Sequence, residues 1–465
     1  MITSINVKNL FGVFNHQINL ENPRNITLIL GENGLGKTII LKFIQAFYEG
    51  NYSAFREYVY DEFVLKFSNR AKLTIHRVVN DKKRIEVYIQ YLDSGKKKPL
   101  SYLLPDSDKR FQNKRHRRDL YDNERRNYYY YKSGQASLFA NDELEFLIDK
   151  FLPFHLERIA SNKWFDPTSK NVLTSNELVE KYSGHFPNDI IDLLNNGTPE
   201  WLRKLTEEIN VKLIETQRLL VKAEEGKYRS SVTDYSRQLM DTIKNKRSEA
   251  TDLGSNLDRT YPNRVISKIE KGDRTDDNYI SKSFVILQEK RELLNAVGLL
   301  DTDEKALQPN INPTFDQTIL NEVLSVYIDD SNEKLNIYNE LSSRIKLLLD
   351  IINKRFTYKK MSIDKANGFV FESTINGKDI PLSGLSSGEQ HELVLFFELL
   401  FNTKKDSLLL IDEPEISLHI SWQKEFINDL SSVAELNNLS IIIATHSPDI
   451  IGNNWGLTVQ LKGIN

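Results

Sequence analysis

A glycine-rich segment at residues 31–38 constrains the fold of this chain more than any other feature of its sequence. It reads GENGLGKT and follows an apolar run at 25–30, which Pro23 and Gly31 bound and which predicts a buried strand. Residues 37–48 then carry apolar side chains at helical spacing. A strand, a glycine-rich turn and a helix in this order predict the start of a βα unit.

The segment fits the pattern G-x4-G-K-T, whose parts suit phosphate binding. Glycines let backbone N–H groups surround phosphate oxygens, and the helix N-terminus adds a partial positive charge. Lys37 would reach the β- and γ-phosphates of a nucleotide such as ATP, and the Thr38 hydroxyl would bind Mg²⁺. The residues that we expect to hold the nucleotide here are Asn33, Gly34, Gly36, Lys37 and Thr38. The alternative is a glycine-rich turn without a ligand.

Two further apolar runs end in polar side chains. Residues 408–411 lead into Asp412 and Glu413, and residues 439–444 lead towards His446. Short, β-rich runs of this buried character favour a parallel sheet, in which the carboxyl ends of the strands meet at one edge. At that edge we expect Asp412 to hold the magnesium shell, Glu413 to polarise the attacking water and His446 to hydrogen-bond the γ-phosphate.

Each of these assignments has a simpler alternative. An exposed acidic turn would also place Asp412 beside Glu413, although clustered carboxylates are costly without nearby cations. A histidine such as His446 is, taken alone, more often structural. Its place at the end of a strand that neighbours the acidic one favours a role at the nucleotide. The expected catalytic residues are therefore Glu413, His446 and Lys37.

A second helix start is predicted further along the chain. The segment 382–390 reads LSGLSSGEQ and precedes an apolar helix expected at 391–401. Ser386, Ser387 and Gly388 would place backbone N–H groups at a helix N-terminus suited to an anion. The same residues also fit an ordinary N-cap with a capping acid.

Taken in order, these motifs resemble those of the ABC-type ATPases. The glycine-rich segment corresponds to Walker A, and residues 385–389 to an LSSGE version of the LSGGQ signature. Residues 408–413 correspond to Walker B with its catalytic acid, and His446 to the switch histidine. The resemblance implies a homodimer with two shared ATPs, in which the signature of one subunit completes the ATP site of its partner.

The same resemblance implies a role for Gln217, which would be the Q-loop glutamine. It would join Thr38 and Asp412 as a third residue of the Mg²⁺ shell. The alternative for Gln217 is a surface glutamine that follows a strand.

The spacing of the motifs narrows the resemblance. Between Thr38 and the signature lie an expected antiparallel meander at 62–67, 72–79 and 84–92 and a polar helical segment at 222–355. This layout resembles the SMC, RecF and OLD group, in which a helical arm is inserted into the ATPase head. The expected fold class is α/β, an ABC-type ATPase head (mixed sheet plus antiparallel β meander) with an inserted α-helical arm.

We expect three segments along the chain. They are an N-terminal lobe of the head at 1–220, a helical insertion at 221–355 and a C-terminal lobe at 356–465. Late in the insertion, apolar residues recur at helical spacing and predict one long amphipathic helix, with 231–253 and 283–298 as its partners. The recurring residues are Leu335, Tyr338, Leu341, Ile345, Leu348 and Ile352.

Within the group, the chain resembles the OLD-like ATPases of bacterial defence, and most closely the PtuA ATPases of Septu and retron anti-phage systems. The segments that carry this resemblance are 413–419 (EPEISLH), 445–448 (THSP), 214–219 (IETQRL) and 257–264 (LDRTYPNR). The resemblance implies an ATPase subunit that regulates a separate HNH nuclease. It also implies pairs that assemble into a larger even-numbered oligomer, with residues 417–419 at the dimer seam.

No nuclease site is expected in this chain itself. OLD nucleases continue into an acidic Toprim domain, whereas only 17 residues follow Pro448 and they contain no acidic cluster. The eight histidines are scattered without an HNH-like pairing, and there is no cysteine to brace one. We therefore expect the nuclease to be a separate polypeptide.

The segment 109–132, in a loop expected near 105–135, is the best candidate for nucleic-acid contact. It contains nine Lys and Arg residues against three acids, together with several tyrosines. Basic side chains neutralise phosphates, and tyrosines stack on unpaired bases. The alternatives are docking on an acidic protein partner and a solvated loop without a ligand.

Two other functions fit the same motifs. One is a RecF- or SMC-like DNA-repair ATPase that clamps DNA, and the other is a PARIS-type ATPase sensor of a toxin. The first would need DNA-stimulated ATP hydrolysis, and the second a Toprim toxin as partner.

Composition excludes several classes of protein. The formal net charge of −3 rules out coating of DNA by bulk charge. The absence of cysteine rules out disulfides, Cys-ligated zinc and a Cys nucleophile, and it is compatible with a reducing cytosol. No run of about 18 apolar residues is present, and the first residues do not resemble a signal peptide. We expect a cytoplasmic protein without a membrane span.

Overall fold

The computed structural model describes most of the chain outside one long central segment. The described residues are 1–22, 24–52, 54–81, 84–104, 157–160, 163–166, 171–174, 198–214, 220–222, 228–271, 275–300 and 317–463. The basic segment 109–132 therefore lies outside them. One compact unit is built mainly from Met1–Asn19 and Lys42–Ile209, and the other from Leu20–Leu41 and Asn210–Gly463.

The first unit contains a six-stranded antiparallel sheet in the order β2-β1-β4-β5-β6-β7. Its strands are β1 (Ile2–Leu10), β2 (Phe14–Asn19), β4 (Glu62–Phe67), β5 (Lys72–Val79), β6 (Ile85–Leu92) and β7 (Leu100–Leu103). The predicted meander is confirmed, and β4 and β5 have the predicted bounds. Alternation of apolar and polar side chains is a local signal, which is why these bounds could be predicted.

The first unit also holds short elements. These are the helices α2 (Ala54–Glu57) and α7 (Glu200–Glu207) and a three-stranded antiparallel sheet of β8 (Glu157–Ala160), β9 (Lys163–Asp166) and β10 (Asn171–Thr174). Helix α1 (Lys37–Tyr48) has the predicted bounds. Its first turn belongs to the second unit and the rest to the first.

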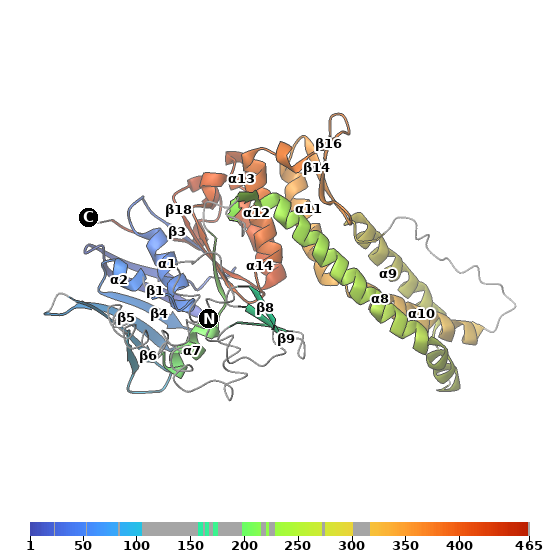
Figure 1. Cartoon of the computed structure of the whole chain (residues 1–465), viewed down its shortest axis with the longest axis horizontal. Helices are drawn as coiled ribbons and strands as arrows, with labels where there is room; N and C mark the ends of the chain where they lie inside the picture. Colours follow the sequence, from blue (N-terminus) through green and yellow to red (C-terminus); the bar gives the residue numbers. More distant parts are fainter. Residues whose placement is uncertain are drawn as a thin grey trace, which may run out of the picture. The chain divides into compact units, whose positions relative to one another are not determined.

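The second unit is built on a five-stranded parallel sheet in the order β11-β17-β18-β3-β19. Figure 1 labels two of its strands, β3 and β18. The strands are β3 (Ile26–Leu30), β11 (Val211–Ile214), β17 (Leu408–Asp412), β18 (Ser440–Thr445) and β19 (Thr458–Gln460). Parallel and antiparallel strands thus occur in separate sheets. Asp412 pairs with Ala444, and Thr445 with Leu30, so β3, β17 and β18 end at the same edge.

Side chains on both faces of this parallel sheet are buried. Leu409 of β17 and Ile441 and Ile443 of β18 belong to the large hydrophobic core of the unit. Leu410 and Ile442, which point to the opposite face, are at most 2% exposed. Burial on both faces explains why these strands read as continuous apolar runs rather than alternating ones.

Three helices of the second unit supply much of this core. They are α11 (Asn339–Arg355), α12 (Ser387–Phe401) and α14 (Phe426–Asn437). Helix α11 packs against both α12 and α14, and α12 also packs against α14. Helix α12 is apolar on most sides and has eight buried residues, so it lies in the interior of the unit.

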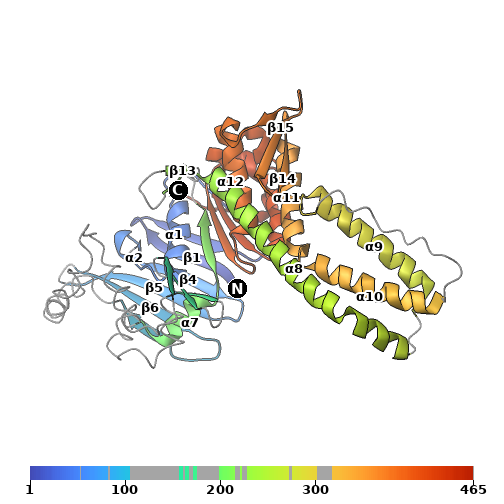
Figure 2. The same cartoon turned by 45° about the vertical axis from the view of Figure 1, so that its right-hand side comes forward.

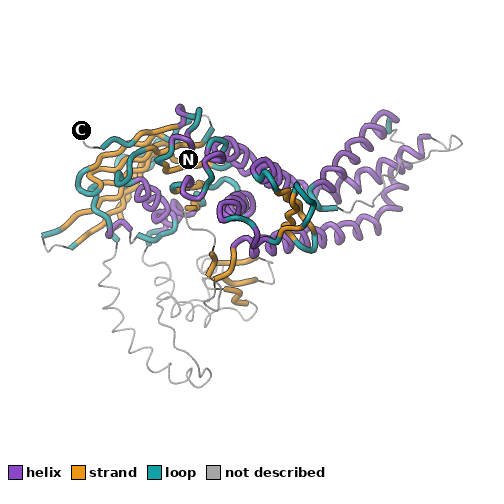
Figure 3. The backbone as a smooth tube through the Cα atoms, turned by 90° about the horizontal axis from the view of Figure 1, so that it is seen from above, coloured by secondary structure: helices purple, strands orange, loops and turns teal. Residues whose placement is uncertain are grey.

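A helical arm extends from this unit (Figures 1 and 2). It consists of α8 (Ser231–Lys271), α9 (Asp277–Ala296) and α10 (Gln317–Asn336), and α10 packs against both other helices. Figure 3 shows these helices side by side, seen from another direction. The inserted helical arm that belongs to the predicted fold class is therefore confirmed.

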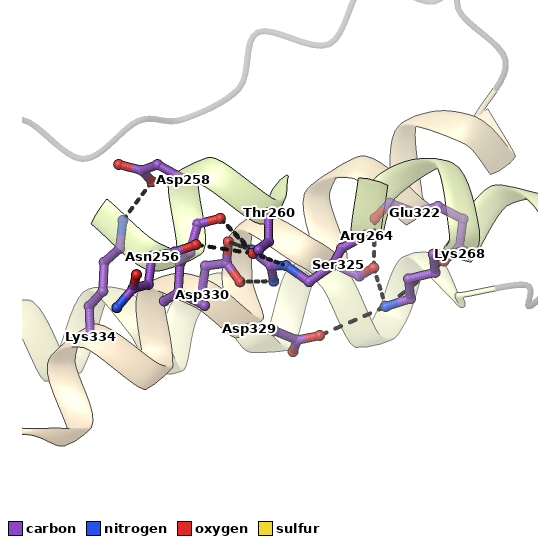
Figure 4. A network of polar contacts seen from close by, with 11 residues as sticks. Asn256, Asp258, Thr260, Arg264, Lys268, Glu322, Ser325, Asp329, Asp330 and Lys334 are labelled. Carbon is purple, nitrogen blue, oxygen red and sulfur yellow. Dashed lines mark hydrogen bonds and ion pairs between the residues drawn. The ribbon is translucent and has the colours of Figure 1, made fainter. Parts of the chain in front are cut away.

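Polar contacts join α8 to α10 along the arm (Figure 4). Arg264 contacts Asp330 through two hydrogen bonds, and its Nη2 lies 2.6 Å from Asp330 Oδ2. Lys268 Nζ donates to Ser325 Oγ at 2.6 Å. Asp330 and Ser325 are buried, so these bonds satisfy polar groups that water does not reach.

The prediction of one long amphipathic helix across residues 335–352 is wrong. The helix is interrupted between α10, which ends at Asn336, and α11, which begins at Asn339. Tyr338 precedes the first turn of α11. Leu335 therefore lies on the arm, whereas Ile345 and Leu348 lie on a helix that packs against α12, α14 and β14 (Lys359–Asp364). Apolar spacing continues across the break because both helices bury a face, so the pattern alone could not reveal two helices.

The other elements of the second unit are short. They are the strands β12 (Leu220–Lys222), β13 (Tyr228–Ser230), β15 (Gly368–Ser373) and β16 (Asp379–Ile380), the helices α13 (Ile420–Gln423) and α15 (Pro448–Ile451), and the 3-10 helices η2 (Leu382–Gly384), η3 (Pro414–Ser417) and η4 (Trp455–Leu457). Strands β14, β15 and β16 form an antiparallel sheet.

The architecture confirms the predicted fold class, an α/β ATPase-type head with an antiparallel meander and an inserted helical arm, but the central sheet is parallel and not mixed as predicted. The predicted division at 1–220, 221–355 and 356–465 follows the order of the sequence and stays a prediction. Within the described part of the chain, no helix combines the length and the apolar character that a membrane crossing requires.

Candidate nucleotide-binding site

The glycine-rich turn between β3 and α1 has the conformation that its glycines permit. Gly34 and Gly36 have φ values of +90° and +87°, in the left-handed region that favours glycine. A Cβ on Gly31 would lie 3.0 Å from Leu35 Cδ1, so that position is also closely packed. Asn33 is exposed beside the turn. This loop can therefore offer its backbone N–H groups to an anion.

Lys37 opens α1 and is buried under the same turn, with 4% of its surface exposed. Its Nζ donates to the carbonyl oxygens of Gly31 at 2.7 Å and Glu32 at 3.0 Å. Burial lowers the pKa of Lys37, and the nearby carboxylates of Glu413, Glu415 and Asp412 oppose that shift. The two carbonyls hold the ammonium group at the loop where phosphates would bind.

Thr38 and Asp412 come together from opposite ends of the sequence. Thr38 Oγ1 donates to Asp412 Oδ1 at 3.1 Å, at the edge where β3 and β17 both end. A hydroxyl and a carboxylate placed together are ligands that Mg²⁺ accepts alongside water and nucleotide phosphates. These two residues therefore fit a magnesium site, and the ion bound there would offset phosphate charge.

Gln217, the third expected magnesium residue, lies outside the described residues. Strand β11 ends at Ile214, next to β17 in the sheet. The role of Gln217 therefore stays a prediction.

Glu413 follows Asp412 in a strained conformation. Its φ and ψ are 44° and 58°, in the left-handed region that costs a residue with a Cβ about 1–2 kcal/mol. Its N–H donates to the carbonyl of Ala444 at 2.9 Å, which continues the ladder between β17 and β18. Strain of this kind often accompanies a functional side chain, and here it turns Glu413 out of the strand direction.

His446 follows β18 and lies beside two carboxylates. Its Nδ1 is 3.8 Å from Glu413 Oε1 and 3.1 Å from Glu415 Oε1. The side chain is 43% exposed, so the ring remains accessible. The structure thus brings the expected catalytic acid and the expected switch histidine to the same edge of the sheet.

Glu415 is a residue to which the sequence analysis gave no role. Its Oε1 accepts hydrogen bonds from the Thr445 hydroxyl at 2.7 Å and from the His446 N–H at 2.8 Å. The signal in the sequence was present, since an acid follows the Asp-Glu-Pro run and precedes an apolar residue. The role of Glu415 could not be predicted, because its hydrogen-bond partners, Thr445 and His446, lie at the end of another strand.

The predicted second helix start is the N-terminus of α12. Ser386 is its N-cap, and a capping box joins Ser386 to Glu389. The Ser386 N–H donates to Glu389 Oε2 at 2.7 Å. In return, Ser386 Oγ accepts from the Glu389 N–H at 3.4 Å. Ser386 and Ser387 are exposed. The N–H groups of Ser387 and Gly388 have no partner inside the helix, so they can face an anion.

Glu389 is held in place by a cation as well. Lys359 Nζ lies 2.5 Å from Glu389 Oε2. Burial would raise the pKa of Glu389, but hydrogen bonds from Lys359 and from Ser386 outweigh it and hold the pKa below its ordinary value. The capping acid is thus a stable anion that fixes the start of α12.

The segment after Glu413 carries exposed apolar side chains. Ile416 and Ile420 are 61% and 65% exposed, on either side of the stretch 417–419. Leu418 between them is buried. Two large exposed aliphatic side chains this close together suit a surface that another protein covers.

Residues 1–451 match a protein-family model described as "AAA ATPase domain". The matched range includes the glycine-rich loop, the signature segment, Asp412, Glu413 and His446.

Comparison with curated proteins finds a distant relative. The zinc import ATP-binding protein ZnuC of Rickettsia bellii is 25% identical over 152 residues, which make up 32% of this chain. The match spans 61% of the length of that protein.

The chain has low similarity to two solved structures of SMC head domains. One is the SMC head of Pyrococcus furiosus with an extended coiled coil, bound to the C-terminal domain of ScpA (13% identity, TM-score 0.33), and the other is the SMC head of Thermotoga maritima (10% identity, TM-score 0.32). Each alignment covers 100% of this chain, and 94% and 95% of the respective structures. TM-scores this low establish no shared fold, so the family match carries the assignment.

Proposed function

Because the chain belongs to the AAA ATPase domain family, we propose that it is the ATP-binding and ATP-hydrolysing subunit of a bacterial anti-phage complex of the Septu or retron PtuA type, and that it regulates a separate HNH nuclease. The observation that carries the ATPase part is the meeting of Lys37, the Thr38–Asp412 pair and the Glu413–His446 pair at the edge of one parallel sheet. Phosphoryl transfer needs cations, a water-orienting acid and a fixed geometry, and this edge supplies all three.

Each side chain has a distinct task in this proposal. Lys37 offsets the charge that spreads over the γ-phosphate, and the Thr38 hydroxyl and Asp412 hold Mg²⁺. Glu413 orients the attacking water, and its carboxylate lies 3.8 Å from His446 Nδ1 at the same edge. His446 hydrogen-bonds the γ-phosphate and responds to its loss.

A second copy of the chain would complete the site. The exposed Ser386 and Ser387 and the open end of α12 would bind a partner's γ-phosphate, as the resemblance to ABC-type ATPases implies. The exposed Ile416 and Ile420 would then be covered in the dimer. Pairs formed through ATP would assemble into a larger even-numbered oligomer.

The defence role rests on the sequence segments that resemble PtuA ATPases. One of them, residues 257–264, lies on α8 around Pro262 and contributes Arg264 to the polar contacts of the arm (Figure 4). An arm that is held this firmly is a suitable platform for a nuclease subunit. The basic segment 109–132 is the proposed site for nucleic acid, either from a retron or from phage.

Co-purification with the products of neighbouring genes, with and without ATP, tests this function. We expect a small HNH protein to co-purify and an ATP-dependent change in the nuclease activity of the complex. The Lys37→Ala variant is the control, since it should abolish the effect of ATP. If DNA stimulates hydrolysis and no nuclease associates, a RecF-like DNA-repair ATPase is the better description; a Toprim partner would favour a PARIS-type sensor.

A further inference from the structure

A buried set of hydrogen bonds ties the segment after Glu413 to the loop that carries His446. Glu415, in η3, accepts from the side chain of Thr445 and from the backbone of His446. Gln423, at the end of α13, accepts from Ser447 Oγ at 2.8 Å. The two ends of the segment 415–423 are therefore both connected to residues 445–447.

Gln423 also stabilises the conformation of its own segment, residues 415–423, through hydrogen bonds. Its Nε2 donates to the carbonyls of Leu418 at 3.2 Å and Glu415 at 3.4 Å. Gln423 is 7% exposed and Glu415 is 8% exposed, so water does not substitute for these bonds. The segment and the histidine loop thus form one rigid group inside the second unit.

The two carboxylate oxygens of Glu415 differ in their hydrogen bonding. Two donors bond to Oε1, the Thr445 hydroxyl and the His446 N–H, and His446 Nδ1 lies 3.1 Å from the same oxygen. Oε2 is buried and has no hydrogen-bond partner among the described residues. A buried carboxylate oxygen without a partner costs free energy and often marks a functional constraint. Glu415 therefore lies beside His446 although its unpaired Oε2 costs free energy of folding. Packing alone would not require this cost.

We propose that Glu415 is a positioning residue for His446. Its carboxylate accepts only, so the nitrogen that faces it must carry the proton, and Nδ1 becomes the N–H of the imidazole ring. Nε2 is then the nitrogen presented to the nucleotide, and a turn of the ring would take Nδ1 away from its position 3.1 Å from Oε1. The proposal deepens the function proposed above and rests on it, because His446 acts on hydrolysis only if ATP binds at this edge.

The same connection reaches the exposed surface of the segment. Ile416 and Ile420 lie between the two tied ends, Glu415 and Gln423. A second copy that covers these side chains would therefore contact the same segment, 415–423, that contains Glu415.

A spectroscopic experiment tests the pairing without reference to ATP hydrolysis. Long-range ¹H–¹⁵N spectra of histidine-labelled protein report which ring nitrogen carries the proton, and His446→Gln identifies the signals of His446. At alkaline pH we expect the Nδ1–H form in the wild type and a shift towards the Nε2–H form in Glu415→Gln. An Nε2–H form in the wild type, or a spectrum that Glu415→Gln leaves unchanged, would overturn the proposal.

Kinetics then test whether the positioning matters. Glu415→Gln should lower kcat by at least about tenfold, as loss of an outer partner of an active-site group commonly does, with KM for ATP within about twofold. In a His446→Gln background, the same change should alter kcat by less than about twofold, because its target is gone. An equal loss in both backgrounds would mean that Glu415 does not act through His446.

The controls separate this proposal from the function on which it rests. Glu435→Gln changes an exposed carboxylate on α14 and should leave both readouts at wild-type values. If Glu415→Gln does not fold, the wild-type spectrum alone still decides whether Nδ1 faces the carboxylate. A wild type that binds no ATP would refute the proposed function, whereas the spectrum would still decide the pairing of Glu415 with His446.

Discussion

The Thr38 hydroxyl donates a hydrogen bond to the Asp412 carboxylate at 3.1 Å, although 374 positions separate the two residues in the chain. The parallel register of β3, β18 and β17 creates this contact, because the strands end together. A loop that can cradle phosphates and an acid that can hold a metal ion are thereby placed at one edge.

Replacement of Glu413 tests the assignment of the water-orienting acid. Glu413→Gln should keep ATP binding but lower kcat by a factor of about 100 or more, the usual contribution of a general base. Steady-state ATPase assays and nucleotide titration check the two parts, with Glu435→Gln as the exposed control. Hydrolysis at the wild-type rate would show that another group orients the water.

Removal of the lysine tests the phosphate loop. Lys37→Ala should weaken ATP binding by at least about tenfold, since it deletes the buried ammonium that would pair with the phosphates. Fluorescent-nucleotide titration measures the change, and Lys404→Ala, on an exposed turn, is the matched control. Unchanged affinity in Lys37→Ala would refute the role of this loop.

An added charge at the start of α12 tests the shared site. A Cβ at Gly388 would have its nearest neighbour, Trp422 Cζ3, at 3.9 Å, so Gly388→Asp fits the folded chain. The new carboxylate would repel a phosphate at that helix end, so ATP-dependent dimers should be lost while ATP binding to the single chain persists.

Light scattering in the Glu413→Gln background, with and without ATP, measures this loss of dimers. Ser432→Asp, on an exposed position of α14, adds the same charge elsewhere and should leave dimers intact. Dimers that persist in Gly388→Asp would place the partner contact somewhere other than the signature.

Acid should weaken the cap of α12. Because its folded-state pKa lies below the ordinary value of 4.5, Glu389 stabilises the fold fully above 4.5, and this contribution is lost as the pH falls towards the folded pKa. Glu389→Gln keeps a capping side chain but removes the ion pair with Lys359. Urea unfolding between pH 7 and acid pH should therefore show a smaller decline below pH 4.5 in Glu389→Gln than in the wild type; equal declines would contradict the prediction.

A buried cation between α11, α12 and α14 makes a strong stability prediction. Arg355 contacts the fully buried Glu392 and also Asp429, and it lies over the ring of Phe396. Arg355→Met should reduce the free energy of unfolding by about 3–5 kcal/mol, because it leaves the fully buried carboxylate of Glu392 without its cation.

The neighbouring residue offers the matched comparison. Lys354 pairs with Glu425 on the surface, so Lys354→Met should cost less than about 1 kcal/mol. Urea denaturation measures both changes. Similar costs for the two variants would mean that burial of the Arg355 pair contributes little.

Much of the fold could be predicted because its signals are local. The helix at 37–48 and the strands at 62–67 and 72–79 have the predicted bounds, since apolar spacing and turn residues act over a few positions. The break between α10 and α11 could not be predicted in this way. Its cause is packing, as one helix buries its face in the arm and the other against α12 and α14.

The glycine-rich loop, Asp412 and Glu413 after the apolar run of β17, and His446 after β18 could be predicted from the order of the amino acids, because each belongs to a short motif whose chemistry is local. The contact between Glu415 and His446 and the direct hydrogen bond from Thr38 to Asp412 are visible only in the folded chain. Such contacts depend on which strands lie side by side and in which register. That pairing is set by burial of the whole sheet rather than by any single segment.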